Sequence, residues 1–63
     1  MNDYYEIGPN GIAHYWYDRD IRSWMIAKRE LPKQGEKYGD QIGSADYAPN
    51  RNVAQQYARE MVQ

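Results

Sequence analysis

The sequence contains no cysteine, no phenylalanine and no threonine. Without cysteine the chain has no disulfide, no thiolate metal ligand and no thiol nucleophile, so packing, hydrogen bonds or a partner must stabilise the fold. A run of about eighteen apolar residues is also missing, and the first residues lack the basic start and apolar middle of a signal peptide. We therefore expect a soluble cytoplasmic protein.

The chain is short, with 63 residues, which predicts one domain over residues 1–63 with a small core. Hydrophobic residues make up 41% and charged residues 27%, a composition typical of a folded domain. The formal net charge of -1 argues against bulk attraction to nucleic acid or anionic membranes. Acidic residues dominate up to Ile21 and basic residues from Arg22 onward. A locally basic face is therefore compatible with the slightly negative net charge.

Turn-forming residues separate three segments that alternate as strands do. Residues 3–7 and 12–17 flank Pro9-Asn10-Gly11, where proline sets its own φ and Asn and Gly tolerate a left-handed conformation, so a hairpin is predicted. A third strand is expected over residues 21–29, after a polar turn at residues 18–20. In that strand Arg22, Trp24, Ile26 and Lys28 alternate with their neighbours and share one side.

Glycine and proline mark the second half of the expected sheet. Residues 30–40 hold one proline and two glycines among charges, which predicts a long exposed hairpin loop. Pairing resumes over residues 41–47. Gly43 interrupts that strand and predicts a bulge or an irregular alternation there.

The last segment has the spacing of an amphipathic helix. Asn50 or Asn52 is a suitable N-cap. The expected apolar stripe consists of Val53, Tyr57 and Met61, flanked by Ala54 and Ala58. Gln55, Gln56, Arg59 and Glu60 lie opposite and face solvent. The sequence thus predicts an α+β fold, a three- to four-stranded antiparallel meander with one C-terminal helix packed on one face.

Residue types that carry chemistry are scarce. His14 is the single histidine and has Asp18 and Asp20 nearby in sequence, but a half-exposed strand histidine is ordinary. Two carboxylates in a turn fall short of the roughly six to eight oxygen ligands that calcium takes. The glycines form no phosphate-binding pattern. We therefore predict no enzyme, no catalytic residue, no cofactor and no metal site.

The aromatic residues are the most informative feature. Seven tyrosines and two tryptophans accompany no phenylalanine, and Tyr and Trp suit a wet binding surface because each combines apolar area with a polar group. Tyr15-Trp16-Tyr17 alternates across the sheet, so the helix covers at most one set of rings. In the third strand we expect Trp24 and Ile26 in the core and Met25, Ala27 and Arg29 outward, with the reverse arrangement left open.

Two interpretations of the rings follow. In one, the tyrosines only widen a thin core. In the other, the uncovered face is an interaction surface, because Tyr, Trp and Arg carry most binding energy at protein interfaces. The predicted partner-binding residues are Tyr15, Tyr17, Arg19, Met25 and Arg29.

The chain from Arg22 onward resembles the three-stranded-sheet-plus-helix modules of plant AP2 domains and phage integrase arm-binding domains. The residues that carry the resemblance are Trp24, Ala27, Ile42, Gly43, Ala54, Tyr57 and Ala58. Those modules lay their sheet in the DNA major groove. The resemblance therefore implies Arg22, Trp24, Lys28 and Arg29 as DNA contacts. In size, and in the segment before the terminal helix, the chain is also similar to small phage and mobile-element accessory proteins.

We predict a non-enzymatic protein-interaction module, of the kind that a mobile element uses to regulate or inhibit a host protein, which binds through the helix-free face or a free strand edge. Homodimerisation would use the same patch and add burial. The alternative is DNA binding through the sheet. The slightly negative net charge and the acidic residues of the first hairpin disfavour that alternative, because they repel phosphates.

Overall fold

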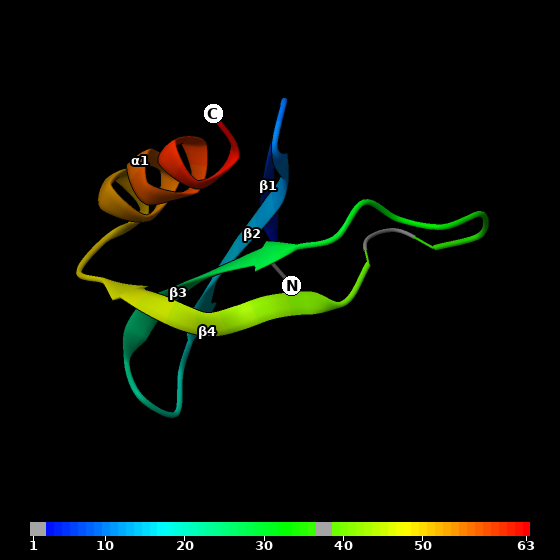
Figure 1. Ribbon diagram of the computed structural model, residues 1–63. Coiled ribbons are helices and arrows are strands. Elements are labelled where there is room, and N and C mark those ends of the chain that lie inside the picture. The colour runs from blue at the N-terminus through cyan, green and yellow to red at the C-terminus, as the bar shows by residue number, and fades with distance from the viewer. Residues whose placement is uncertain (1–2, 37–38) are drawn as a thin grey trace.

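The computed structural model describes residues 3–36 and 39–63, which form one antiparallel sheet with a helix packed on it (Figure 1). The strands are β1 (Tyr4–Gly8), β2 (Gly11–Asp18), β3 (Ser23–Arg29) and β4 (Gln41–Ala48), and their order in the sheet is the order along the chain. The helix α1 (Arg51–Val62) follows β4. The predicted α+β meander is confirmed, with four strands.

Two turns connect the first three strands. Gly8 pairs with Gly11, so the first hairpin closes through Pro9 and Asn10, as predicted. The third strand begins two residues later than predicted. Arg22 has a φ of 53°, in the left-handed region that a strand does not contain, and it therefore lies in the turn before Ser23.

The pairing of β3 with β4 is irregular, as Gly43 predicted. Ile26 pairs with Asp46 and Lys28 with Ile42, so three residues of β4 lie opposite one residue of β3. Gly43 has a φ of 73°, which glycine adopts without the steric cost of a Cβ. The even number of extra residues keeps Ile42 and Asp46 on the same side of β4.

The helix begins with an asparagine cap. The side-chain oxygen Oδ1 of Asn50 accepts a hydrogen bond from the backbone N–H of Val53 at 2.9 Å, which satisfies one free amide of the first turn. The predicted stripe was displaced by one residue. The buried positions are Ala54, Ala58 and Val62. Tyr57 is 40% exposed, because the small alanines let the helix approach the sheet closely and the bulky ring stays at its side.

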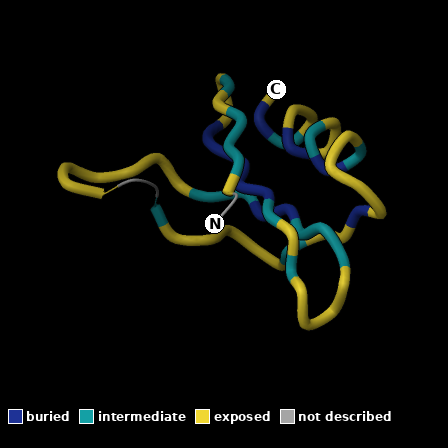
Figure 2. The backbone as a smooth tube through the Cα atoms, turned by 180° about the vertical axis from the view of Figure 1, so that it is seen from behind, coloured by how far each residue is buried: buried dark blue, intermediate teal, exposed yellow. Residues whose placement is uncertain are grey.

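One core lies between α1 and the sheet, where buried positions from separate elements meet (Figure 2). Its buried members are Ala13, Tyr15, Ile26, Ala48, Ala54, Ala58 and Val62. The partly buried residues packed against it are Tyr4, Trp24, Val53 and Met61. Trp24 and Ile26 thus belong to the core as predicted, with Ile26 fully buried. Within the described residues, no helix has the length and apolar character that crossing a membrane requires.

The end of α1 is anchored to the first hairpin. The backbone N–H of Asn10 donates to the carbonyl oxygen of Val62 at 3.0 Å, and the Asn10 side-chain amide donates to the carbonyl oxygen of Gln63. Gly8 lies so close to this helix end that a Cβ on it would overlap the Val62 carbonyl group. The turn therefore satisfies helix carbonyls that have no partner within α1.

Substitution of Gly8 by alanine tests this anchor. We expect Gly8→Ala to lower the free energy of unfolding by about 1–3 kcal/mol, because the added methyl forces the helix end away from the hairpin. Urea denaturation followed by circular dichroism measures the change. The control is Ile7→Ala at the neighbouring position, whose side chain is 77% exposed. Equal stability of the Gly8→Ala and Ile7→Ala proteins would contradict the proposed close contact.

Candidate interaction surface

The side of the sheet that faces away from α1 carries an ordered set of large side chains, which we call the open face. Strand register defines it: Tyr5 pairs with His14, and Trp16 pairs with Met25, which in turn pairs with Tyr47. Its members are Tyr5, Ile7, Ile12, His14, Trp16, Met25, Ala27, Arg29 and Tyr47. Along β1, β2 and β3, helix-covered residues alternate with these.

His14 lies at the centre of the open face, between two aromatic rings. Its imidazole stacks on Tyr5 at a centroid distance of 4.9 Å and on Trp16 at 4.5 Å. The residue is only 6% exposed although no helix covers it. The flanking rings cover the imidazole, and the three side chains form a stacked row across β1 and β2.

Polar contacts determine which nitrogen of the His14 ring carries the proton in its neutral form. Nε of Arg29 lies 3.4 Å from Nδ1, and a guanidinium can only donate, so Nδ1 accepts. The proton then belongs on Nε2, which lies 3.2 Å from Oδ1 of Asp3 and donates to it. The carboxylate beside His14 thus comes from the start of the chain and not from Asp18 or Asp20.

His14 is enclosed by side chains from both neighbouring strands, Tyr5 of β1 and Arg29 of β3. Both nitrogens of His14 have partners and both ring faces are stacked, so the imidazole is held in place. Asp18 instead forms the predicted polar turn, in which its Oδ1 accepts from the N–H of Asp20 at 2.9 Å. Across residues 3–36 and 39–63, no group of three or more His, Asp or Glu side chains could hold a metal ion.

Two of the predicted partner-binding residues were assigned to the wrong face. Tyr15 pairs with Ile26 and Tyr17 with Trp24, so both lie on the helix-covered side. Tyr15 is 3% exposed and belongs to the core, where its hydroxyl donates to Oε2 of Glu6 at 3.4 Å. Tyr17 lies farther along β2, where it stays partly exposed and packs edge-on against Trp24.

The other predicted partner-binding residues are divided between two places. Met25 and Arg29 lie on the open face, as predicted, and both are half-buried. Nη1 of Arg29 also donates to the carbonyl oxygen of Gly39 at 3.4 Å. Arg19 is exposed in the turn between β2 and β3, beyond the end of the paired strands. The structure therefore groups Met25 with Arg29 and separates Arg19 from them.

Sequence reasoning missed several members of the open face. These are Tyr5, Ile7, Ile12, His14, Trp16 and Tyr47. The sequence contained a signal for Trp16. If Trp24 and Ile26 are core residues, Met25 between them faces outward. The residue that pairs with Met25 in an antiparallel hairpin lies on the same face, and that residue is Trp16. The register that pairs Met25 with Trp16 depends on the length of the turn between β2 and β3. The sequence predicts the third strand from residue 21, whereas β3 begins at Ser23.

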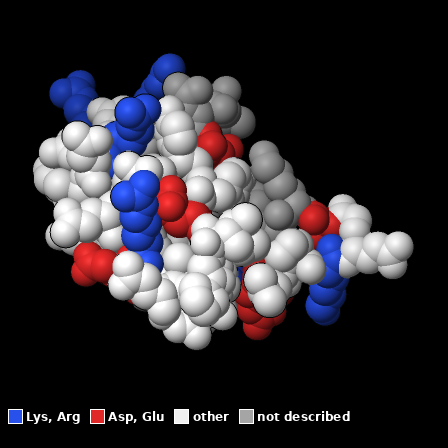
Figure 3. Space-filling view, turned by 90° about the horizontal axis from the view of Figure 1, so that it is seen from above, with Lys and Arg blue, Asp and Glu red and all other residues white. Residues whose placement is uncertain are grey.

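The four residues that the AP2 resemblance implied as DNA contacts do not form one surface. Arg22 lies in a turn, Arg29 lies on the open face, and Trp24 and Lys28 lie on the helix-covered side, since they pair with Tyr17 and Ala13. On the α1 side of the molecule, Lys and Arg side chains are interspersed with Asp and Glu (Figure 3). That mixture provides no uniform positive field on this side.

Comparisons with protein-family models, with curated protein sequences and with solved structures return no match to this chain. The resemblance to AP2 and integrase arm-binding domains therefore stays a prediction.

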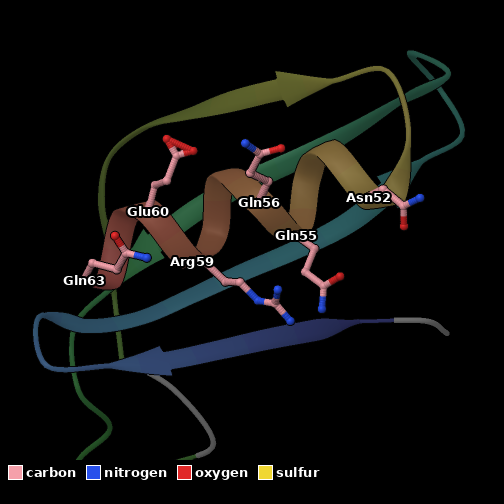
Figure 4. A pocket seen from close by; sticks show the side chains of 6 residues that line it. All are labelled: Asn52, Gln55, Gln56, Arg59, Glu60 and Gln63. Atoms are coloured by element: carbon pink, nitrogen blue, oxygen red, sulfur yellow. The ribbon is translucent and has the colours of Figure 1, made fainter.

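A hollow on the solvent side of α1 has a different character from the open face. Polar side chains line it: Asn52, Gln55, Gln56, Arg59, Glu60 and Gln63 (Figure 4). Arg59 extends toward β1, where its Nε lies 3.3 Å from Oε1 of Glu6. This is a solvated helix surface with one exposed ion pair, and such pairs contribute about 1 kcal/mol or less.

Tyr15 provides a pH-dependent test of the core assignment. Burial, followed by the nearby Glu6 carboxylate, raises the pKa of the Tyr15 phenol above its ordinary value of 10.0. The unfolded chain then loses this proton at lower pH than the folded protein, so stability is lost as pH rises above 10.0 toward the folded pKa.

We expect the Tyr15→Phe protein to lose less stability than the parent protein in this alkaline range. Below pH 10.0 the difference between the two should be constant. Urea denaturation at several pH values between about 8 and 11 measures it. All other tyrosines are shared by the two proteins, so parallel stability curves throughout would show that Tyr15 is not in a desolvated site.

Proposed function

We propose that the protein is a non-enzymatic interaction module that binds a partner protein through the open face. The observation that carries this proposal is the stacked row of Tyr5, His14 and Trp16 on a face that α1 leaves uncovered. Aromatic side chains held in one conformation lose little entropy on binding, so they provide contact area at low cost.

The chemistry of the surrounding residues supports a protein partner. Met25 lies beside Trp16 and offers a flexible apolar contact, and Tyr47 extends the surface onto β4 with 63% of its area exposed. Arg29 adds a guanidinium at the opposite end of β3. Aromatic residues, Met and Arg are the types enriched in protein interfaces.

The balance of charge also favours protein over nucleic acid. Arg29 is the one basic member of the open face, and Asp3 lies beside the central histidine. Affinity for nucleic acid comes mainly from several cations that neutralise phosphates, and this face places an acidic group near its single arginine. A partner that presents apolar and aromatic groups fits it better.

Affinity capture with and without nuclease is the first step of the test, and binding by purified components is the second. We expect a captured partner to be retained after nuclease treatment. In a titration with that purified partner, Met25→Lys should weaken binding by about tenfold or more, because the substitution introduces a charge beside Trp16.

The matched control is Gln56→Lys, which makes the same charge change on the exposed side of α1. We expect the Gln56→Lys protein to bind like the parent. Circular dichroism establishes that both variants are folded. Equal affinity of the Met25→Lys and Gln56→Lys proteins, or a partner lost on nuclease treatment, would rule out the open face as a protein-binding surface.

A further inference from the structure

The helix leaves a second surface uncovered, on the opposite side of the sheet from the open face. Figure 1 shows α1 at the upper left and β4 at the lower edge of the sheet, and α1 contacts β4 less than it contacts β1, β2 or β3. An open groove lies between α1 and β4, lined by Asp46 and Tyr47 of β4 and by Tyr57, Glu60 and Met61 of α1. We call it the β4 groove.

The β4 groove combines apolar walls with negative charge. Tyr57 and Met61 are one helical turn apart and form the wall on α1, with Tyr57 40% exposed. Asp46 and Glu60 are both exposed, and none of the five lining residues is basic. In the part of the chain that the structure describes, neither carboxylate forms an ion pair.

The groove runs beside an unpaired strand edge. β4 pairs with β3 on one side, and no described strand pairs with its other side. The unpaired backbone groups of such an edge can accept an added strand. The irregular segment near Gly43 restricts regular pairing to the end of β4 that contains Asp46.

Geometry relates the added strand to the groove. Asp46 lies on the helix-covered side of β4, because it pairs with the core residue Ile26. A strand paired with this edge would place every second side chain on that same side, above the groove. A side chain opposite Asp46 would lie beside a carboxylate, and the next on that face would extend along the wall formed by α1.

We propose that the β4 groove binds an extended segment of a partner protein in which basic residues (Lys or Arg) and apolar residues alternate at every second position, so that both kinds lie on the same face of the segment. The segment pairs with the edge of β4 near Asp46. Its basic groups lie against Asp46 and Glu60, and its apolar groups lie against Tyr57 and Met61. Of the residues that line the groove, Tyr47 also belongs to the open face, whereas Asp46, Tyr57, Glu60 and Met61 do not.

The probe is the synthetic eight-residue peptide Ser-Lys-Ser-Val-Ser-Lys-Ser-Val, whose Lys and Val side chains share one face of a strand, titrated into the isotopically labelled full chain. We expect chemical-shift changes at the amides of β4 near Asp46 and of α1 from Tyr57 to Met61. Changes confined to the open face would overturn the proposal. So would the absence of any change at millimolar peptide.

Two further peptides establish what the groove recognises. The peptide with Glu in place of each Lys should produce no shift, because its charge has the wrong sign. The peptide Ser-Lys-Val-Ser-Ser-Lys-Val-Ser has the same composition and should bind more weakly, because its Lys and Val side chains lie on opposite faces of a strand. Equal binding of all three peptides would show nonspecific adhesion and overturn the proposal.

Charge reversal identifies the carboxylates. The double variant Asp46→Lys with Glu60→Lys should raise the dissociation constant of the Lys–Val peptide about tenfold. The control is Glu30→Lys, a substitution at an exposed position just after β3. The Glu30→Lys protein should have the same dissociation constant as the parent protein. Equal weakening by the control would overturn the assignment to the groove. A peptide-free chain that sediments as a dimer, with its interface mapped to β4 by the amide shifts, would show that the edge pairs with a second copy. That result would also overturn the proposal.

Discussion

The close approach of α1 to the sheet is the constraint on which the rest of the structure depends. Ala54 and Ala58 are fully buried, so the helix backbone lies near the strands and small helix side chains pack against the larger strand residues Tyr15 and Ile26. The helix end also lies close to the first hairpin, where Gly8 has no side chain and Asn10 donates to the carbonyl oxygens of Val62 and Gln63. This contact thus links the turn between β1 and β2 to the C-terminal end of α1.

A single helix of twelve residues covers one side of the sheet, and it covers β4 least. The opposite side is therefore built differently. There Tyr5 and Trp16 bury His14 between their rings, and Asp3 and Arg29 occupy its two nitrogens. This polar and aromatic packing organises an exposed face without a second layer of structure.

The two proposed surfaces differ in chemistry because different elements border them. The open face is defined by strand residues alone and is rich in rings. The β4 groove has one wall from α1 and a free strand edge, with Asp46 and Glu60 as its charges. Tyr47, on the outermost strand, borders both surfaces. A protein of this size can therefore present two distinct chemistries without a cavity, because most of its residues lie at or near the surface.

The sequence by itself determined the elements: alternation and turn residues predicted the strands, Gly43 predicted the irregular pairing, and the four-residue spacing of Val53, Tyr57 and Met61 after Asn50 or Asn52 predicted the helix. Each of these signals lies within a single short segment of the chain. Only the tertiary structure decided which rings are buried. The register of β2 against β3 places Tyr15 under the helix and Trp16 outside, and a shift of one residue would exchange them. The assembly around His14 joins Asp3 and Arg29 from distant parts of the chain, a proximity that no local pattern encodes.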